Sequence, residues 1–198
     1  MKLIGMLDSP YVRRVAITLD LLGLPFDHEA LSVFRNYDAF GAINPAVKAP
    51  TLVLDDGTIL MDSSLIIEYA DALAGRSLLP AAPAARAQAL RALGPALAAC
   101  EKTAQIVYEY KLRPPEKQHQ PWLDRVQEQL FAALRLLEAE TAAFDAGALD
   151  QAGITAAVAW SFIQLMIPQI VARDYFPRLA AWSARAETLP VFRRYPID

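Results

Sequence analysis

The sequence predicts an α/β domain followed by an all-helical domain. An apolar run, a helical pattern and a second strand-like pattern succeed one another between Leu3 and Leu31, in the order of a parallel βαβ unit. Two further apolar runs then flank an Asp-Gly turn, and an amphipathic helix follows them. Beyond Pro80 the strand patterns stop, and apolar residues recur with helical spacing.

The composition narrows the class of protein. The chain has 198 residues, of which 55% are apolar, and a net charge of -3, so it can bury a substantial core. The balanced charge and the absence of a basic run argue against a nucleic-acid partner. Cys100 is the single cysteine and cannot form an internal disulfide, which favours a reducing, cytoplasmic setting. The apolar run Leu3–Leu7 is too short for a secretory signal, so we expect no export.

The first strand and the first helix meet at Ser9. The run Leu3–Leu7 predicts a strand, and the apolar residues after Pro10 recur at helical spacing as far as Gly23. Proline suits the first helical position because its missing N–H would have no partner there. Ser9 then has two open roles: its oxygen caps the first-turn amides, or its hydroxyl turns outward and donates to a ligand.

The rest of the first domain follows from alternation and turn residues. Residues Phe26–Leu31 alternate as a half-buried strand does, and Val33–Ile43 predicts a short helix and a loop. Thr51–Leu54 and Thr58–Met61 flank the turn Asp55–Gly57, which predicts an antiparallel hairpin.

A helix and a boundary complete this part of the chain. Asp62 and Ser63 open the helix, which ends at Gly75. Two prolines interrupt residues 78–83, where no periodicity remains. We therefore predict a first domain over 1–76, a linker over 77–85 and a helical domain over 86–198.

The helical domain is predicted to contain four long helices: Ala84–Lys111 with a bend at Gly94-Pro95, Trp122–Phe144, one from about Ile154, and Phe176–Leu189. The segment Gln151–Ala172 has no charged residue and is long enough to span a bilayer. Polar residues such as Ser161 and Gln164 interrupt it, and it lacks a basic flank. We expect a buried core helix and no membrane partner.

Four motifs together match one known family. They are Ser9–Arg13 (S-P-F/Y-x-R), Asn44–Leu52 (N-P-x-G-K-V-P-x-L), Asp62–Tyr69 (E/D-S-x-x-I-x-x-Y) and Pro177–Trp182 (P-x-L-x-x-W). In their order and spacing, the chain resembles bacterial serine-type (theta/zeta-like) members of the glutathione S-transferase superfamily over nearly its full length. The resemblance implies a thioredoxin-like N-terminal domain, βαβαββα, and an all-α C-terminal domain. It also implies glutathione as co-substrate.

The resemblance gives Ser9 a catalytic role. A free thiol titrates near ~8.5, so little thiolate exists at neutral pH. The Ser9 hydroxyl would donate to the glutathione sulfur while the first-turn amides add partial positive charge. Ser9 is then a hydrogen-bond donor and not a nucleophile, since no nearby His or acid would activate it. Tyr11 is the alternative donor.

The resemblance also assigns glutathione-binding residues. The family's matching proline is cis, so the Ala49-Pro50 bond would turn the backbone of Ala49 toward the cysteinyl part of glutathione. Ser63 would hold the γ-glutamyl carboxylate and Asp62 the amine, unless Asp62 merely caps its helix. Lys48 and Arg35 either hold the glycyl carboxylate or are solvated surface charges.

The chain departs from the family pattern at two places. Val47 stands where relatives have glycine, so we expect the loop before Lys48 to run differently. The helix from about Ile154 lacks the family's Asp and has Ala157 near that place. Either Gly153 or Thr155 then caps this helix less strongly, or the alignment shifts by one residue.

The second substrate is expected in an apolar pocket. The resemblance places Leu7 and Tyr11 on one side of it and Tyr108, Leu112 and Trp160 on the other, which indicates a small apolar electrophile. The alternative is that these residues belong to the core, and this is the expectation for Trp160. Dehalogenation, isomerisation and a non-catalytic binding role remain alternatives.

Other chemistries and partners are also constrained. Disulfide-reducing members need a cysteine near the first helix, where this chain has none, and we expect Cys100 in the core or an interface. We expect no metal, because His28 and His119 lack a second ligand at suitable spacing. The resemblance implies a homodimer, formed by the first domain packing on the partner's long helix.

Overall fold

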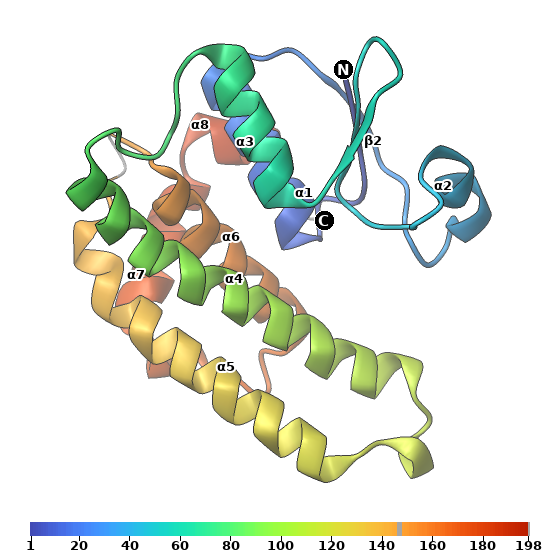
Figure 1. Ribbon diagram of the computed structural model, residues 1–198. Helices are drawn as coiled ribbons and strands as arrows, with labels where there is room; N and C mark the ends of the chain where they lie inside the picture. Colours follow the sequence, from blue (N-terminus) through green and yellow to red (C-terminus); the bar gives the residue numbers. More distant parts are fainter. Residues whose placement is uncertain (146–147, 198) are drawn as a thin grey trace. The chain divides into compact units, whose positions relative to one another are not determined.

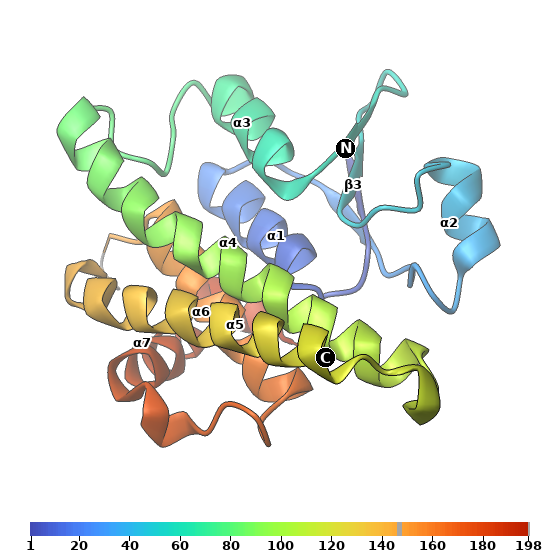
Figure 2. The ribbon, with the colours of Figure 1, turned by 60° about the horizontal axis from the view of Figure 1, so that its bottom comes forward.

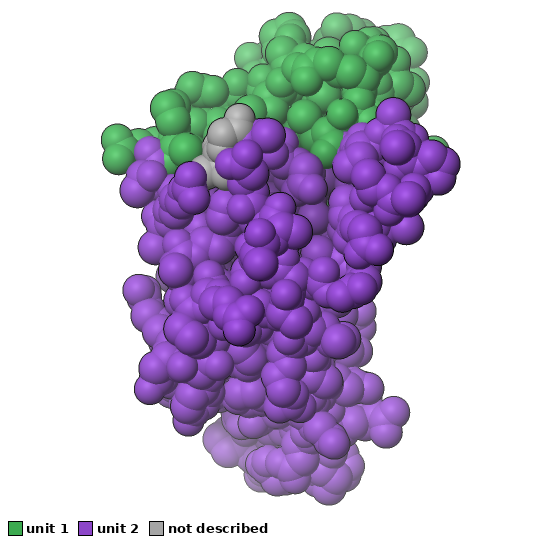
Figure 3. Space-filling view, turned by 90° about the vertical axis from the view of Figure 1, so that its left-hand side faces the viewer, with its two compact units in different colours: residues 1–78, 189–198 green, residues 79–188 purple. Residues whose placement is uncertain are grey.

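The computed structural model describes residues 1–145 and 148–197, and its contacts divide the chain into two compact units (Figure 3). Unit 1 contains Met1–Leu78 and Leu189–Asp198, and unit 2 contains Leu79–Thr188. Residues 189–197 therefore group with unit 1, although the predicted helical domain 86–198 includes them. Residues 146, 147 and 198 of that predicted range lie outside the described residues. The predicted domain bounds stay a prediction.

The strands of unit 1 form a mixed sheet in the order β2-β1-β3-β4. They are β1 (Lys2–Ile4), β2 (Asp27–Glu29), β3 (Thr51–Val53) and β4 (Ile59–Met61). β1 runs parallel to β2 and antiparallel to β3, and β3 runs antiparallel to β4. The βαβ unit and the hairpin that the sequence predicts are both confirmed.

Helices lie on both sides of this sheet. α1 (Pro10–Leu22) and α3 (Ser63–Ala74) lie side by side over one face, and α2 (Tyr37–Ile43) lies on the other side (Figure 1). The core between the sheet and the paired helices is apolar, because each element turns its apolar stripe inward. It includes Leu3, Val12, Val15, Leu19, Leu52, Ile66 and Ala70. The element order βαβαββα is thus confirmed.

The last helix, α8 (Pro190–Arg194), belongs to unit 1, because α8 and the residue after it contact α1. The Arg13 Nε atom donates to the Tyr195 carbonyl at 2.7 Å, and the Arg13 guanidinium lies 5.5 Å from the centre of the Phe192 ring. Arg194 forms a bidentate pair with Asp20 at 2.7 and 2.9 Å. The predicted helix Phe176–Leu189 ends before this segment, at Glu187.

Unit 2 is helical, as predicted. Its long helices are α4 (Pro83–Leu112), α5 (Gln120–Glu140), α6 (Gln151–Met166) and α7 (Pro177–Glu187). α4 packs against α5 and α6, and α7 packs against α6 (Figure 2). Short 3₁₀ turns lie between them: η1 (Pro115–Lys117), η2 (Thr141–Ala143) and η3 (Arg173–Tyr175). α4 continues through Pro95 as one helix.

α6 is the buried centre of unit 2. All residues from Gln151 to Trp160 are buried, so the uncharged helix is a core helix, as the sequence predicts. Within the described residues, no helix has the combined length and apolar character that a bilayer crossing needs. Cys100 is buried on α4, in agreement with its expected place in the core.

The predicted cap of α6 is wrong. The helix begins three residues before Ile154, and Asp150 is its N-cap, with Oδ1 accepting a 2.7 Å bond from the Gly153 amide. Neither Gly153 nor Thr155 caps the helix, because both lie inside its first two turns. The Trp182 Nε1 atom donates to the Gly153 carbonyl at 2.9 Å, which ties α7 to the start of α6.

Candidate functional site

Ser9 lies at the N-terminus of α1. It has extended backbone angles, φ -72° and ψ 121°, and Pro10 follows it in the first helical turn. Its Oγ atom accepts a long 3.5 Å bond from the Val12 amide. This contact uses an oxygen lone pair and leaves the hydroxyl proton to donate. The two roles that the sequence leaves open for Ser9 are therefore compatible.

The turn before Ser9 depends on Gly5, which directly follows β1. Gly5 has φ 139°, a conformation that favours glycine. A Cβ atom at Gly5 would lie 2.6 Å from the Val12 Cγ2 atom. Glycine therefore lets the end of β1 pass close to the first turn of α1, and this close approach sets the position of Ser9.

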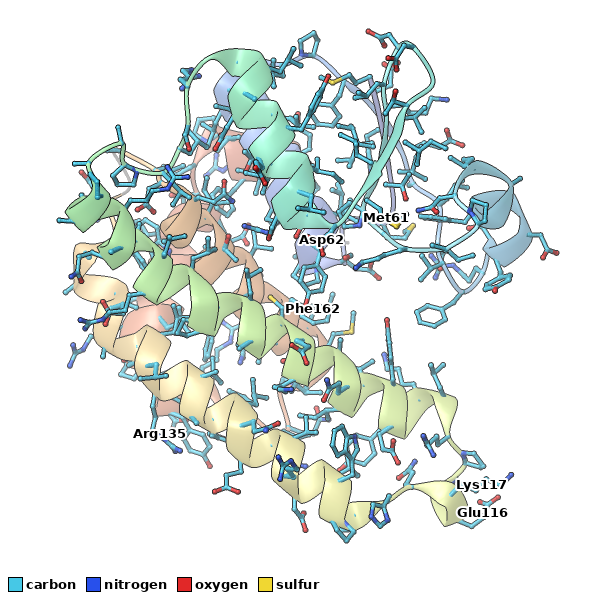
Figure 4. The ribbon with its side chains drawn as sticks, viewed as in Figure 1. Met61, Asp62, Glu116, Lys117, Arg135 and Phe162 are labelled. Carbon is cyan, nitrogen blue, oxygen red and sulfur yellow. The ribbon has the colours of Figure 1, made fainter. Side chains whose placement is uncertain are left out.

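A second helix N-terminus carries Asp62. Figure 4 labels Asp62 at the junction of β4 and α3, directly after Met61. Asp62 is the N-cap of α3 and has φ 78°. Its Oδ1 atom accepts a 2.9 Å bond from the Ser64 amide, and its Oδ2 atom lies 3.4 Å from the Lys48 Nζ atom.

The pKa of Asp62 is lowered from its ordinary value. Partial burial is the largest single influence and acts to raise the pKa, but it is outweighed. The Ser64 amide and the Lys48 ammonium donate hydrogen bonds to the carboxylate, and the charge of Lys48 also favours its ionised form. Asp62 is thus an anion that is ready to receive a cationic group.

Ser63 is the first residue of α3 and is buried. Its Oγ atom accepts a 2.9 Å bond from the Arg14 Nη1 atom, which also donates to the Ser64 Oγ atom at 3.3 Å. Arg14 is missed by the sequence reasoning. Adjacent helical residues can both lie on a solvated face, so the pair Arg13-Arg14 by itself does not indicate burial.

The loop between α2 and β3 corrects one expectation. Val47 adopts φ 46°, so the loop takes the positive φ that valine was expected to avoid. Hydrogen bonds from Asn44 stabilise this loop. The Asn44 carbonyl accepts from the Val47 amide at 2.9 Å, and the Asn44 side-chain amide donates to the Thr51 hydroxyl at 2.8 Å. The Ala49-Pro50 peptide bond is cis, as the resemblance implies.

The predicted residues for the glycyl carboxylate lie at the surface. Lys48 contacts Asp62, and 53% of its side chain is exposed. Arg35 is exposed too, with its Nη2 atom 4.0 Å from the Met6 sulfur. Lys48 thus contacts Asp62, and Arg14 contacts the next residue, Ser63. Ser9 caps the helix that carries Arg14.

The residues predicted for the second-substrate pocket belong to different units. Leu7 is buried and Tyr11 is half-buried in unit 1, and Tyr108 and Leu112 are exposed on α4 in unit 2. A pocket formed by these four residues stays a prediction. Trp160 is buried in the core of unit 2, where its ring meets Phe176 edge-on.

Possible metal ligands do not form a cluster among the residues that the structure describes. Among residues 1–145 and 148–197, no group of three or more His, Cys, Asp or Glu side chains is placed to hold a metal ion. His28 instead bonds the Gly5 carbonyl through Nε2 at 2.7 Å. The candidate site therefore consists of two helix N-termini, a loop and their polar side chains.

The sequence is similar to known glutathione S-transferases. Residues 3–78 match the family described as "Glutathione S-transferase, N-terminal domain". Glutathione S-transferase U4 of Arabidopsis thaliana is 32% identical over 90 residues, and the match covers 45% of this chain and 40% of that protein. The GST-like protein YibF of Escherichia coli K12 is 28% identical over 141 residues, 70% of this chain and 68% of that protein.

A solved structure matches over the whole length. A glutathione transferase family member from Pseudomonas fluorescens Pf-5, with bound glutathione, is 30% identical. The match covers 100% of this chain and 98% of that chain, with a TM-score of 0.85.

Proposed function

Because this chain belongs to the glutathione transferase superfamily, we propose that it is a glutathione S-transferase that activates the glutathione thiol for attack on a small apolar electrophile. The bound glutathione of the Pseudomonas fluorescens relative supports glutathione as the ligand. The position of Ser9 supports the activation step and carries the proposal, because its hydroxyl proton is left to donate at the N-terminus of α1.

The activation step is electrostatic. A thiol with a pKa near ~8.5 is mostly protonated at neutral pH, and each unit of lowering requires about 1.4 kcal/mol of preferential stabilisation of the thiolate. One hydroxyl donor and the partial positive charge of the first-turn amides together supply about one to two units. The thiolate electron pair then forms a bond to an electrophilic carbon. In a substitution, the electron pair of the broken bond leaves with the displaced group; in an addition, the electron pair of the broken π bond moves to the far end of the acceptor, which takes up a proton from water.

The polar ends of glutathione are assigned to the other helix and the loop. Asp62 receives the ammonium of the γ-glutamyl group, and Ser63 with the first-turn amides of α3 receives its carboxylate. The lowered pKa of Asp62 supports the first of these contacts. The Ala49 backbone pairs with the cysteinyl part, and Lys48 or Arg35 holds the glycyl carboxylate.

Glutathione binding and conjugation test this function. Calorimetry with glutathione tests binding, and no heat of binding at millimolar concentration would leave only a non-catalytic scaffold. Conjugation rates of Ser9→Ala and Tyr11→Phe with apolar electrophiles test the donor. We expect Ser9→Ala to lose about tenfold to hundredfold in rate and Tyr11→Phe to keep it. An unchanged rate in Ser9→Ala would remove Ser9 from the mechanism.

We also propose a homodimer through unit 1. β4 and α3 expose large apolar side chains that a second copy would cover: Ile59, Met61, Leu65 and Leu73. Exposed apolar side chains of this size on two neighbouring elements favour an interface. The mass of the protein in solution tests this proposal, and a monomeric mass at micromolar concentration would refute it.

A further inference from the structure

Two adjacent buried arginines on α1 contact different parts of unit 1. Arg13 is 0% exposed and Arg14 is 1% exposed. Arg13 contacts the C-terminal segment through the Tyr195 carbonyl and the Phe192 ring. Arg14 donates to the hydroxyls of Ser63 and Ser64 at the start of α3. A buried charge is expensive unless it is well bonded, so each arginine needs a reason for its place.

The contact from Arg14 determines what the Ser63 hydroxyl does. A guanidinium only donates hydrogen bonds, so the Ser63 oxygen must accept at 2.9 Å. The hydroxyl proton then points away from Arg14. Ser63 is the first residue of α3, where backbone amides also lack partners within the helix. The hydroxyl, the amides and the charge behind them together favour an anion at this helix end.

Asp62 adds the opposite charge beside this position. Its carboxylate is ionised and is only partly buried, with 43% of the side chain exposed. A positive potential at Ser63 and a negative one at Asp62 complement a group that carries a carboxylate and an ammonium on one carbon. That group is the α-amino acid end of a ligand.

We propose that Arg14 is a positioning residue for the ligand's α-carboxylate: it makes the Ser63 hydroxyl an acceptor and so directs its proton to the ligand. The inference rests on the proposed function, in which Ser63 receives the γ-glutamyl carboxylate of glutathione. Lysine would keep the charge at position 14 but lose the planar guanidinium that bonds both hydroxyls. Comparing Arg14→Lys with Arg14→Met therefore separates the effect of the charge from that of the hydrogen-bond geometry.

The test compares two ligands in four proteins. Calorimetry measures the affinity of wild type, Arg14→Met, Arg14→Lys and Arg13→Met for glutathione and for γ-aminobutyryl-cysteinylglycine, which lacks only the α-carboxylate. We expect Arg14→Met to weaken glutathione binding about tenfold to hundredfold and to change the affinity for the analogue less than about twofold. Arg14→Lys should recover part of the loss. Arg13→Met is the matched control, because it removes a neighbouring buried arginine and should leave the ratio of the two affinities unchanged.

Two outcomes overturn the inference in distinguishable ways. If Arg14→Met or Arg14→Lys weakens both ligands equally, Arg14 has a structural role only, and the proposed function stands. If wild type binds neither ligand, the proposed function fails and the inference fails with it. A further pair of variants covers the case in which Arg14→Met does not fold. Once Ser63→Ala has removed the hydroxyl, adding Arg14→Lys should cost no further selectivity, and additive losses would contradict the proposal.

Discussion

The Lys48 ammonium lies 3.4 Å from the Asp62 carboxylate, so two side chains that the sequence assigns to opposite ends of glutathione are partners of each other. The contact uses Oδ2, while Oδ1 accepts from the Ser64 amide. In the proposed complex, the ammonium of glutathione would share Oδ2 with Lys48 or replace Lys48 there. Partial burial acts to raise the pKa of Asp62, but the hydrogen bonds from the Ser64 amide and from Lys48 outweigh it and lower the pKa.

Asp62→Asn separates the charge of Asp62 from its structural role. Asparagine caps helices as well as aspartate and also often adopts a positive φ such as the 78° seen here. We expect glutathione affinity to fall about tenfold, with a change in unfolding free energy below about 1 kcal/mol. Asp62→Ala should lose the cap as well. Calorimetry and chemical denaturation measure both effects, and full affinity in Asp62→Asn would show that Asp62 is only a cap.

The pH dependence of binding follows from the lowered pKa of Asp62. The folded-state pKa lies below the unfolded value of about 3.9, so ionised Asp62 favours the folded state. The stabilisation of the folded state by ionised Asp62 is fully present above the unfolded pKa, and it is lost as the pH falls through the folded pKa. Glutathione affinity should accordingly show no Asp62 titration between pH 5 and 8. Calorimetry over this range compares wild type with Asp62→Asn, and a step present only in wild type would contradict the assignment.

Val47 provides a test of backbone strain. At a negative φ, a protein with alanine is more stable than the same protein with glycine by about 0.5–1 kcal/mol. At the φ of 46° that Val47 adopts, a Cβ atom is unfavourable and the order should reverse. We expect Val47→Gly to be about 1 kcal/mol more stable than Val47→Ala. Denaturant unfolding of the two variants measures the difference, and a more stable Val47→Ala would mean that the loop takes another conformation.

The cap of α6 predicts a graded loss of stability. Asp150→Ala removes the 2.7 Å bond to the Gly153 amide and should lower the unfolding free energy by about 1 kcal/mol. Asp150→Asn keeps a capping oxygen and should cost less than about 0.5 kcal/mol. Thermal unfolding measures the stability of Asp150→Ala and Asp150→Asn, and hydrogen exchange shows whether the first turn of α6 opens more often in Asp150→Ala. Equal stability of Asp150→Ala and wild type would show that the cap contributes nothing.

Local sequence patterns predict most of the fold. The strand pattern of the first residues, the Asp-Gly turn and the glycines after α1 and α3 are local signals, and the structure confirms the elements that they predict. The position of Ser9 is also predictable, because a Ser-Pro pair before a helical pattern marks a helix start. Asp150 was not predicted as a cap because the helix was expected to begin near Ile154, whereas it begins at Gln151.

The other differences come from contacts between distant residues. Arg14 of α1 contacts Ser63 and Ser64 of α3 only because the two helices lie side by side, and no local sequence pattern shows that packing. The grouping of residues 189–197 with unit 1 depends on contacts such as that between Arg13 and Tyr195, far apart in the chain. At Val47, the hydrogen bonds around Asn44 hold a conformation that the residue itself disfavours.

The pKa of the thiol in bound glutathione tests the central claim most directly. Ultraviolet absorbance of the thiolate, followed against pH with saturating glutathione, gives this pKa in wild type, Ser9→Thr and Ser9→Ala. We predict a pKa at least about one unit below ~8.5 in wild type, a similar value in Ser9→Thr, and a value near that of free thiol in Ser9→Ala. An equally lowered pKa in Ser9→Ala would contradict the account.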